Sequence, residues 1–155
     1  MTTLSASRKA GPAPQWMALF LPRLPTDRLM RSGTTPPDQR PLVVYAKTRN
    51  AFTLTAVDMH AAKLGLELGM PLADARAIRP DLMAHEADEA ADAHLLDQIA
   101  AWCERFTPIV VPDPPHGLLL DVTGCTHLFG GASALLSETR VMLAWAVRAW
   151  ACSAA

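Results

Sequence analysis

The chain has 155 residues, of which 50% are apolar and 19% charged, a composition that excludes an intrinsically disordered protein and suits one packed domain. Its formal net charge of -1 excludes a strongly basic nucleic-acid-binding protein, although it leaves room for a local basic patch. Three cysteines are too few for a disulfide framework, and no apolar run is long enough to cross a membrane. We therefore expect a cytoplasmic protein without membrane contact.

The first third of the chain contains one apolar run, then a segment rich in proline and glycine that favours loops, and then a run of β-branched residues. In chain order this predicts a disordered tail over residues 1–15, a strand over 16–21, a short helix over 27–31 with Thr26 as its N-cap residue, and a loop over 32–39. Strands follow over 42–46 and 52–57, and the short link between them favours an antiparallel hairpin.

Two short helices and a possible strand complete the first half. Asp58 is the expected N-cap residue of a helix over 58–64, Pro71 is suited to begin a second helix that ends at Ile78, and residues 82–85 can form a strand.

The clearest helical pattern lies over residues 88–106. Apolar residues recur there with spacings of 4, 4, 3 and 4, at Ala91, Leu95, Ile99, Trp102 and Phe106. Strands are predicted over 109–111 and 117–122, and a last helix over 132–149. We expect the two strands to pair antiparallel beside residues 16–21, with the long helix packed on that sheet, which makes the fold class α+β.

Several segments resemble the N-terminal part of Y-family (UmuC/DinB-type) translesion DNA polymerases, and more closely the ImuB-like proteins of bacterial mutagenesis cassettes. They are ALFLPRLPTDRL over 18–29, AVDMHAAKLGLELGMP over 56–71, GMPLADARA over 69–77, CERFTP over 103–108, and GLLLDVTG over 117–124, which continues through the overlapping LDVTGCTHLFGG over 120–131. The resemblance covers residues 16–136 and implies a palm and fingers region with a mixed or antiparallel palm sheet. Residues 137–155 are expected to form a divergent C-terminal helix, in a chain that stops before the thumb and little-finger domains.

The resemblance also implies where catalytic carboxylates should stand, because two-metal phosphoryl transfer needs oxygen ligands for Mg²⁺. The acidic positions of the first palm strand fall on Phe20 and Pro22, and the later Asp–Glu pair falls on His116 and Gly117. None of these side chains supplies a hard oxygen ligand. We therefore expect no catalytic residue, no metal site and no cofactor in this chain.

Other chemistry-bearing residues have structural explanations that we favour. The Tyr and Arg that hold the triphosphate in the family fall on Met59 and Ala62, with the nearby Lys63 read as a solvated lysine. Asp121 and Asp113 are more readily explained by local hydrogen bonding and turn formation than by catalysis. A soft-metal site built from Cys125 and His127, with Cys103 or His116 as a third ligand, is the least favoured alternative.

Four cations are candidates for weak nucleic-acid binding: Lys47, Arg49, Arg23 and Arg28. The first two fall at the predicted hairpin turn and the others follow the first strand. Each either contacts a DNA phosphate or remains a solvated surface charge, and the near-neutral total predicts weak binding.

Three functions remain open. The preferred one is a non-catalytic, polymerase-like scaffold in DNA repair and translesion synthesis during the SOS response to DNA damage. Its partners by resemblance are DNA, a sliding clamp, the RecA-like accessory protein ImuA and an error-prone DNA polymerase subunit. The alternatives are an active Y-family DNA-directed DNA polymerase with unconventional ligands, and a vestigial truncated gene product.

Overall fold

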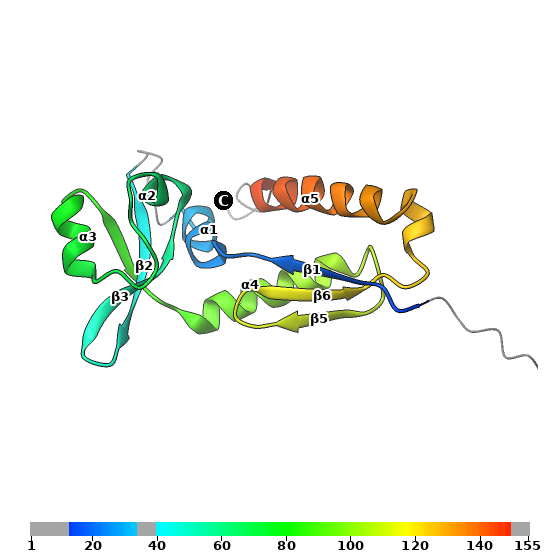
Figure 1. Ribbon diagram of the computed structural model, residues 1–155, viewed down its shortest axis with the longest axis horizontal. Coiled ribbons are helices and arrows are strands. Elements are labelled where there is room, and N and C mark those ends of the chain that lie inside the picture. Colours follow the sequence, from blue (N-terminus) through cyan, green and yellow to red (C-terminus); the bar gives the residue numbers. More distant parts are fainter. Residues whose placement is uncertain (1–12, 34–39, 150–155) are drawn as a thin grey trace, which may run out of the picture.

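The computed structural model describes residues 13–33 and 40–149. Within these residues two three-stranded sheets lie at opposite ends of an elongated molecule, with helices packed on them (Figure 1). One sheet has the strand order β1-β6-β5 and the other β3-β2-β4. The α+β class is therefore confirmed. The predicted tail and most of the predicted loop after Gly33 lie outside the described residues.

The first sheet is antiparallel throughout and consists of β1 (Trp16–Phe20), β6 (Gly117–Asp121) and β5 (Val110–Asp113). This confirms the prediction that two late strands pair beside the first one. The register places Met17 opposite Leu120 and Leu19 opposite Leu118. Side chains alternate between the two faces of a strand, so these four apolar residues share one face and form part of the core.

Helix α4 (Glu89–Cys103) covers that face. Its N-cap residue is Asp88, whose carboxylate accepts a hydrogen bond from the Ala91 N–H at 2.9 Å. Leu95 and Ile99 are buried as predicted, whereas Trp102 is only half-buried, with the Arg105 guanidinium 4.1 Å from its ring centroid.

The helix ends three residues earlier than predicted, because the chain turns after Cys103 and brings Phe106 back into the core. There the Phe106 ring contacts Trp102 and Phe129, with centroid separations of 5.5 and 5.9 Å.

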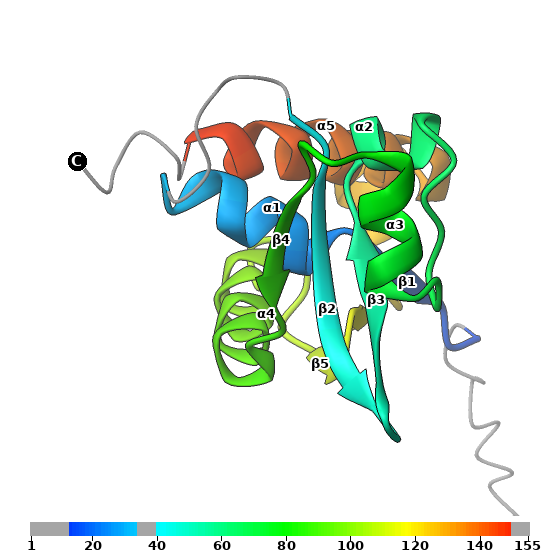
Figure 2. The same cartoon turned by 90° about the vertical axis from the view of Figure 1, so that its left-hand side faces the viewer.

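The second sheet is mixed and has a core of its own. Strands β2 (Leu42–Thr48) and β3 (Ala51–Val57) form the predicted antiparallel hairpin, and β4 (Met83–Glu86) lies parallel to β2 (Figure 2). In the chain, α2 (Met59–Lys63) and α3 (Leu72–Ile78) come between β3 and β4, and both helices pack on one face of this mixed sheet. The residues of this core are Val43, Leu54, Ala61, Leu66, Leu72 and Ala75. Asp58 is the N-cap residue of α2, as predicted, and accepts from the Ala61 N–H at 2.6 Å.

Helix α1 (Leu24–Arg31) contacts β2 and β3 of the mixed sheet and also α4, the helix that packs on the antiparallel sheet. It begins earlier than predicted and Thr26 is not its N-cap residue. Pro25 lies in the first turn, where its fixed φ favours the helix, and the buried Thr26 hydroxyl instead donates to the Arg23 carbonyl oxygen at 3.0 Å. The Arg28 Nε donates to the Asp92 carboxylate at 2.6 Å and so joins α1 to α4.

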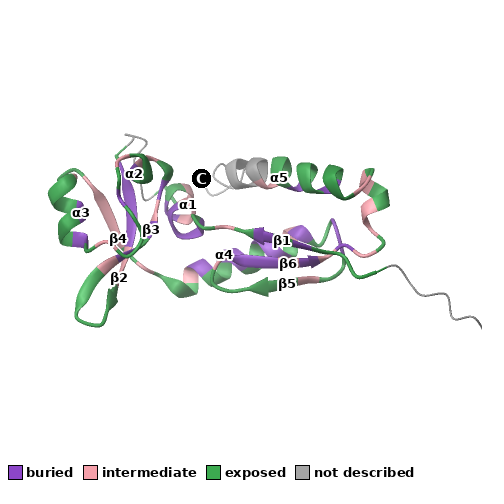
Figure 3. Cartoon of the chain, in the orientation of Figure 1, coloured by how far each residue is buried: buried purple, intermediate pink, exposed green. Residues whose placement is uncertain are grey.

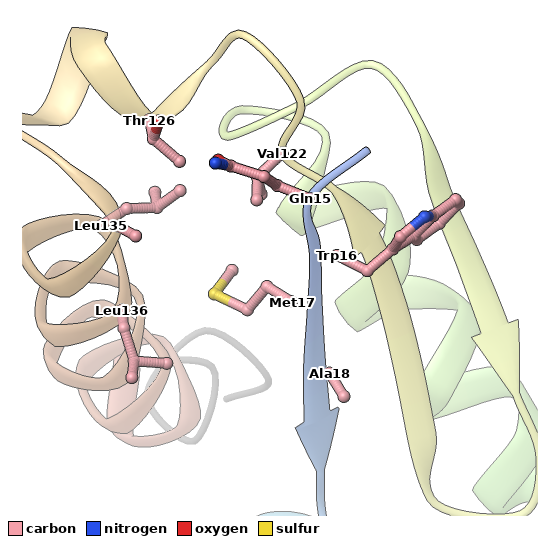
Figure 4. A pocket seen from close by; sticks show the side chains of 9 residues that line it. Gln15, Trp16, Met17, Ala18, Val122, Thr126, Leu135 and Leu136 are labelled. Carbon is pink, nitrogen blue, oxygen red and sulfur yellow. The ribbon is translucent and has the colours of Figure 1, made fainter. Parts of the chain in front are cut away.

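After β6 the chain forms a short 3₁₀ helix over Thr126–Phe129, which the sequence pattern did not predict, and then the predicted last helix, α5 (Ala132–Ala149). A cavity of about 470 Å³ separates α5 from the outer edge of β1, and Met17 and Leu135 point into it (Figure 4). The burial map shows buried residues in the strands of both sheets and mostly exposed residues over 132–143 of α5 (Figure 3). Over residues 13–33 and 40–149, no helix has the length and apolarity needed to cross a bilayer.

The core beneath the antiparallel sheet generates a stability prediction. Ile99 is 2% exposed and packs between α4 and the strands, so Ile99→Ala should lower the free energy of unfolding by about 2–5 kcal/mol. Urea unfolding followed by circular dichroism measures the change. Asp97→Ala, on the exposed side of the same helix, is the matched control and should change it by less than about 0.5 kcal/mol. Equal effects of the two variants would contradict this packing.

The ion pair between Arg28 and Asp92 generates a second stability prediction. The side chains are only 19% and 11% exposed, so removing one partner leaves a poorly solvated charge. Arg28→Met and Asp92→Leu should each destabilise the protein by about 3 kcal/mol, and the double variant by less than the sum of the two. Thermal and urea unfolding of all four proteins complete the double-mutant cycle. Additive effects would show that the two groups do not interact.

Candidate functional site

The end of the antiparallel sheet brings together the positions that the resemblance assigns to catalytic carboxylates. Phe20 lies directly opposite Gly117 in the register of β1 and β6. The Leu21 N–H donates to the His116 carbonyl oxygen at 2.8 Å, which extends the pairing by one step beyond the strands. Phe20, His116 and Gly117 therefore meet at one sheet end, although Phe20 precedes the other two by about a hundred residues.

Gly117 has no room for a side chain. A Cβ atom at this position would lie 2.8 Å from the Asp113 carbonyl oxygen and 3.2 Å from its Oδ2 atom. The first contact is with backbone, so relief would require the turn between β5 and β6 to move. The Asp113 carboxylate itself lies over the glycine. This hairpin end, as folded, cannot present a glutamate from position 117.

The side chains at the three other positions, Phe20, Pro22 and His116, also lack oxygen ligands. The Phe20 ring is 73% exposed at the end of β1, and an aromatic ring offers no lone pair to a hydrated cation. His116 is half-buried, and its Nδ1 atom is buried without a hydrogen-bond partner. An imidazole suits softer metals than Mg²⁺. Within the described part of the chain, no three His, Cys, Asp or Glu residues are grouped so as to hold a metal ion. The residues present therefore do not fit a pair of Mg²⁺ ions.

A cavity of about 390 Å³ lies between this sheet end and the mixed sheet. Pro114, Pro115 and His116 line one side of it, and small side chains of β2 and β3 line the other. The remaining lining residues are Pro25, Ala87, Glu89, Asp92 and Ala93. None of the lining residues that the structure describes is Lys or Arg, and two are acidic. The cavity is thus poorly suited to hold a triphosphate.

The positions of the triphosphate clamp lie on α2. Met59 is 53% exposed, and Ala62 and Lys63 are exposed as well. Neither a thioether nor a methyl group donates a hydrogen bond to phosphate. Only Lys63 carries charge on this segment, and its exposure agrees with the interpretation as a solvated lysine.

Asp121 has a local hydrogen-bonding role. Its carboxylate accepts a hydrogen bond from the Thr123 N–H at 2.9 Å. Hydrogen bonds from the Thr123 side chain and backbone lower the pKa of Asp121 below its ordinary value. Its carbonyl oxygen accepts from the Thr107 hydroxyl, which ties the end of β6 to the segment before β5.

The four candidate nucleic-acid-binding cations lie in different surroundings. Lys47 and Arg49 are exposed at the β2–β3 hairpin, where Arg49 has a φ of 57°. Arg23 is exposed at the start of α1, but Arg28 is engaged by Asp92. That any of them contacts DNA stays a prediction.

Sequence reasoning did not find the Arg28–Asp92 pair, whose members are 64 residues apart and carry no motif. The packing of Asp113 on Gly117 did have a signal, since a glycine after a proline-rich turn often marks a close backbone approach.

Comparison with known proteins agrees with the resemblance. The model of the impB/mucB/samB family matches residues 35–151. Protein ImuB of Caulobacter vibrioides is 45% identical over 87 residues, which is 56% of this chain and 19% of that protein. DNA polymerase IV of Actinobacillus pleuropneumoniae is 30% identical over 101 residues, or 65% of this chain and 28% of that enzyme. The chain thus spans only 19% to 28% of the length of these relatives.

Solved structures show the same fold. A crystal structure of DinB from Sulfolobus solfataricus superposes with a TM-score of 0.63 at 18% identity, over 81% of this chain and 36% of that one. A post-insertion binary complex of Dbh DNA polymerase gives 0.65 at 17% identity, over 85% and 36%. At such identities the likeness concerns the fold alone, whereas the family match extends over most of the chain. The chain therefore belongs to the impB/mucB/samB family, within the Y-family polymerase superfamily, and it is ImuB-like.

Proposed function

We propose that this chain belongs to a non-catalytic, polymerase-like protein that acts in DNA-damage tolerance as a scaffold for an error-prone DNA polymerase. The observation that carries the proposal is the end of the β5–β6 hairpin, where the Asp113 backbone occupies the space that a side chain at position 117 would need. Phe20 stands opposite with a hydrocarbon ring. Metal-dependent phosphoryl transfer depends on carboxylate oxygens that converge on one point, and these positions offer none.

Family membership supports a role in the response to DNA damage, and similarity to ImuB supports the scaffold role. A scaffold of this kind would work with DNA, a sliding clamp, a RecA-like accessory protein such as ImuA, and a separate error-prone polymerase. Because the chain spans only 19% of the ImuB relative, these partners are part of the proposal.

An active polymerase with unconventional ligands is the second candidate. Its support is the Asp113 carboxylate, which lies beside Gly117 and close to where the family places its acidic pair. Asp121, at the other end of β6, is the next carboxylate, but it already accepts a hydrogen bond from the Thr123 N–H. One carboxylate cannot hold two ions, so this candidate requires further ligands.

Metal titration separates the two candidates. Mn²⁺ titrated into the wild-type chain, followed by electron paramagnetic resonance, should show no site tighter than millimolar. Phe20→Asp places a second carboxylate across Gly117 from Asp113 and should tighten Mn²⁺ binding about tenfold or more, since paired carboxylates favour the ion. Phe52→Asp, on the exposed β2–β3 hairpin, is the matched control and should leave it unchanged.

A micromolar Mn²⁺ site on the wild-type chain that disappears in Asp113→Asn would overturn the non-catalytic proposal. Template-dependent primer extension that Asp113→Asn abolishes would do the same and would favour the enzyme.

DNA binding generates a separate prediction. With a net charge of -1, the chain should bind DNA weakly, through phosphates, and with little sequence preference. Fluorescence anisotropy with a labelled duplex should show affinity at low salt that falls steeply as salt rises. Lys47→Gln and Arg49→Asn should each reduce the slope of log affinity against log salt by about one. Lys63→Gln is the control and should not change it, while tight, salt-insensitive binding would reveal a different DNA site.

A further inference from the structure

The antiparallel sheet has a second face on which no described helix packs; α5 lies beside the β1 edge of the sheet, where Trp16 and Ala18 also line the cavity of about 470 Å³. In Figure 1, α4 lies behind the strands, on the side where Met17 and Leu118 are buried. Met17 and Trp16 point in opposite directions from β1 (Figure 4). We call the side that carries Trp16 the outer face.

Strand register defines the residues of the outer face. Neighbours across an antiparallel ladder share a face, and residues two apart along a strand do the same. Three rows of three positions result. They are Trp16, Asp121 and Ile109; Ala18, Leu119 and Val111; and Phe20, Gly117 and Asp113.

The outer face is apolar and exposed. Trp16 is 54% exposed, Phe20 73%, Ile109 48% and Val111 45%. Ala18 and Leu119 lie between them and continue the apolar surface. Contiguous apolar surface of this kind marks an interaction site, and exposed Trp and Phe are typical anchors of protein interfaces.

Charge on the outer face selects among possible occupants. Of its nine positions, only Asp113 and Asp121 are charged, and both are acidic. A nucleic acid would bring its phosphates against these carboxylates. A second copy docked face to face would bring four aspartates together without a cation. A protein surface with an apolar centre and Lys or Arg at its edge has neither conflict.

Dimensions favour a helix. Three strands span about 10 Å, close to the diameter of one α-helix with its side chains. We propose that the outer face is a docking surface for an amphipathic helix of a partner protein, with apolar residues against Phe20, Val111 and Trp16 and basic residues beside Asp113 and Asp121. The inference rests on the proposed function, because only a protein that does not use this sheet end for catalysis leaves the face free.

A designed peptide tests the surface directly. The probe is an 18-residue amphipathic helix with a leucine face flanked by lysines, labelled for fluorescence anisotropy and titrated with the whole chain. The matched control is the same peptide with glutamate in place of every lysine. The lysine peptide should bind at least tenfold more tightly than the glutamate peptide at low salt.

Variants locate the binding site. Phe20→Ser and Val111→Ser should each weaken binding of the lysine peptide about tenfold. Leu68→Ser and Phe52→Ser, at 62% and 49% exposed positions outside the outer face, should leave it unchanged. Asp113→Asn and Asp121→Asn should reduce the preference for lysine over glutamate. Circular dichroism melts of every variant verify that the fold is retained.

Other outcomes overturn the proposal. These are the absence of peptide binding, equal loss in the control variants, a DNA duplex that competes for the site, or sedimentation showing self-association that Phe20→Ser abolishes. Failure here is distinct from failure of the proposed function. A wild-type Mn²⁺ site would remove the non-catalytic function, whereas absent peptide binding without metal binding would remove only the docking surface.

Discussion

The approach of the Asp113 carbonyl oxygen to Gly117 decides what the end of the antiparallel sheet can hold. At 2.8 Å from an ideal Cβ position, this backbone contact exists only because residue 117 has no side chain. The approach lies at the end of the β5–β6 hairpin, where Gly117 also pairs with Phe20 of β1 and where the neighbouring His116 lines the cavity beside the mixed sheet. The absence of a side chain at position 117 is therefore matched by the backbone around it, which would have to move to accommodate one.

Helix α1 determines how the sheet end meets the rest of the molecule. It packs against β2 and β3 on one side and α4 on the other, and the Arg28–Asp92 pair closes the second contact. Pro25 of this helix and Asp92 of α4 both line the cavity next to His116. The position of the cavity thus depends on how α1 packs, with Leu24 in the core beneath the antiparallel sheet and Leu29 against Leu42, Val44 and Ala56 of the mixed sheet.

Local sequence signals predicted most helices and strands, because these elements form through interactions between residues only a few positions apart. The helical spacing of Leu95 and Ile99 and the N-cap at Asp58 needed no tertiary information. Errors arose where tertiary packing or a competing local signal prevailed. Thr26 is buried and bonded within its own turn while the helix already begins at Leu24, and Phe106 lies beyond the helix end in an aromatic cluster. The positions assigned to catalytic carboxylates followed from the resemblance alone, whereas the lack of room for a side chain at Gly117 and the Arg28–Asp92 pair could be recognised only in the three-dimensional structure.

Alternation along β1 has a consequence for how such a protein can change. Met17 and Leu19 are each 8% exposed and belong to the core, whereas Trp16, Ala18 and Phe20 face outward. Substitutions at the outward set leave the contacts that fold the chain intact, so mutation can exchange the chemistry of the sheet while the scaffold persists. Because inward and outward residues alternate along β1, the fold can be conserved while the chemistry of the exposed face changes.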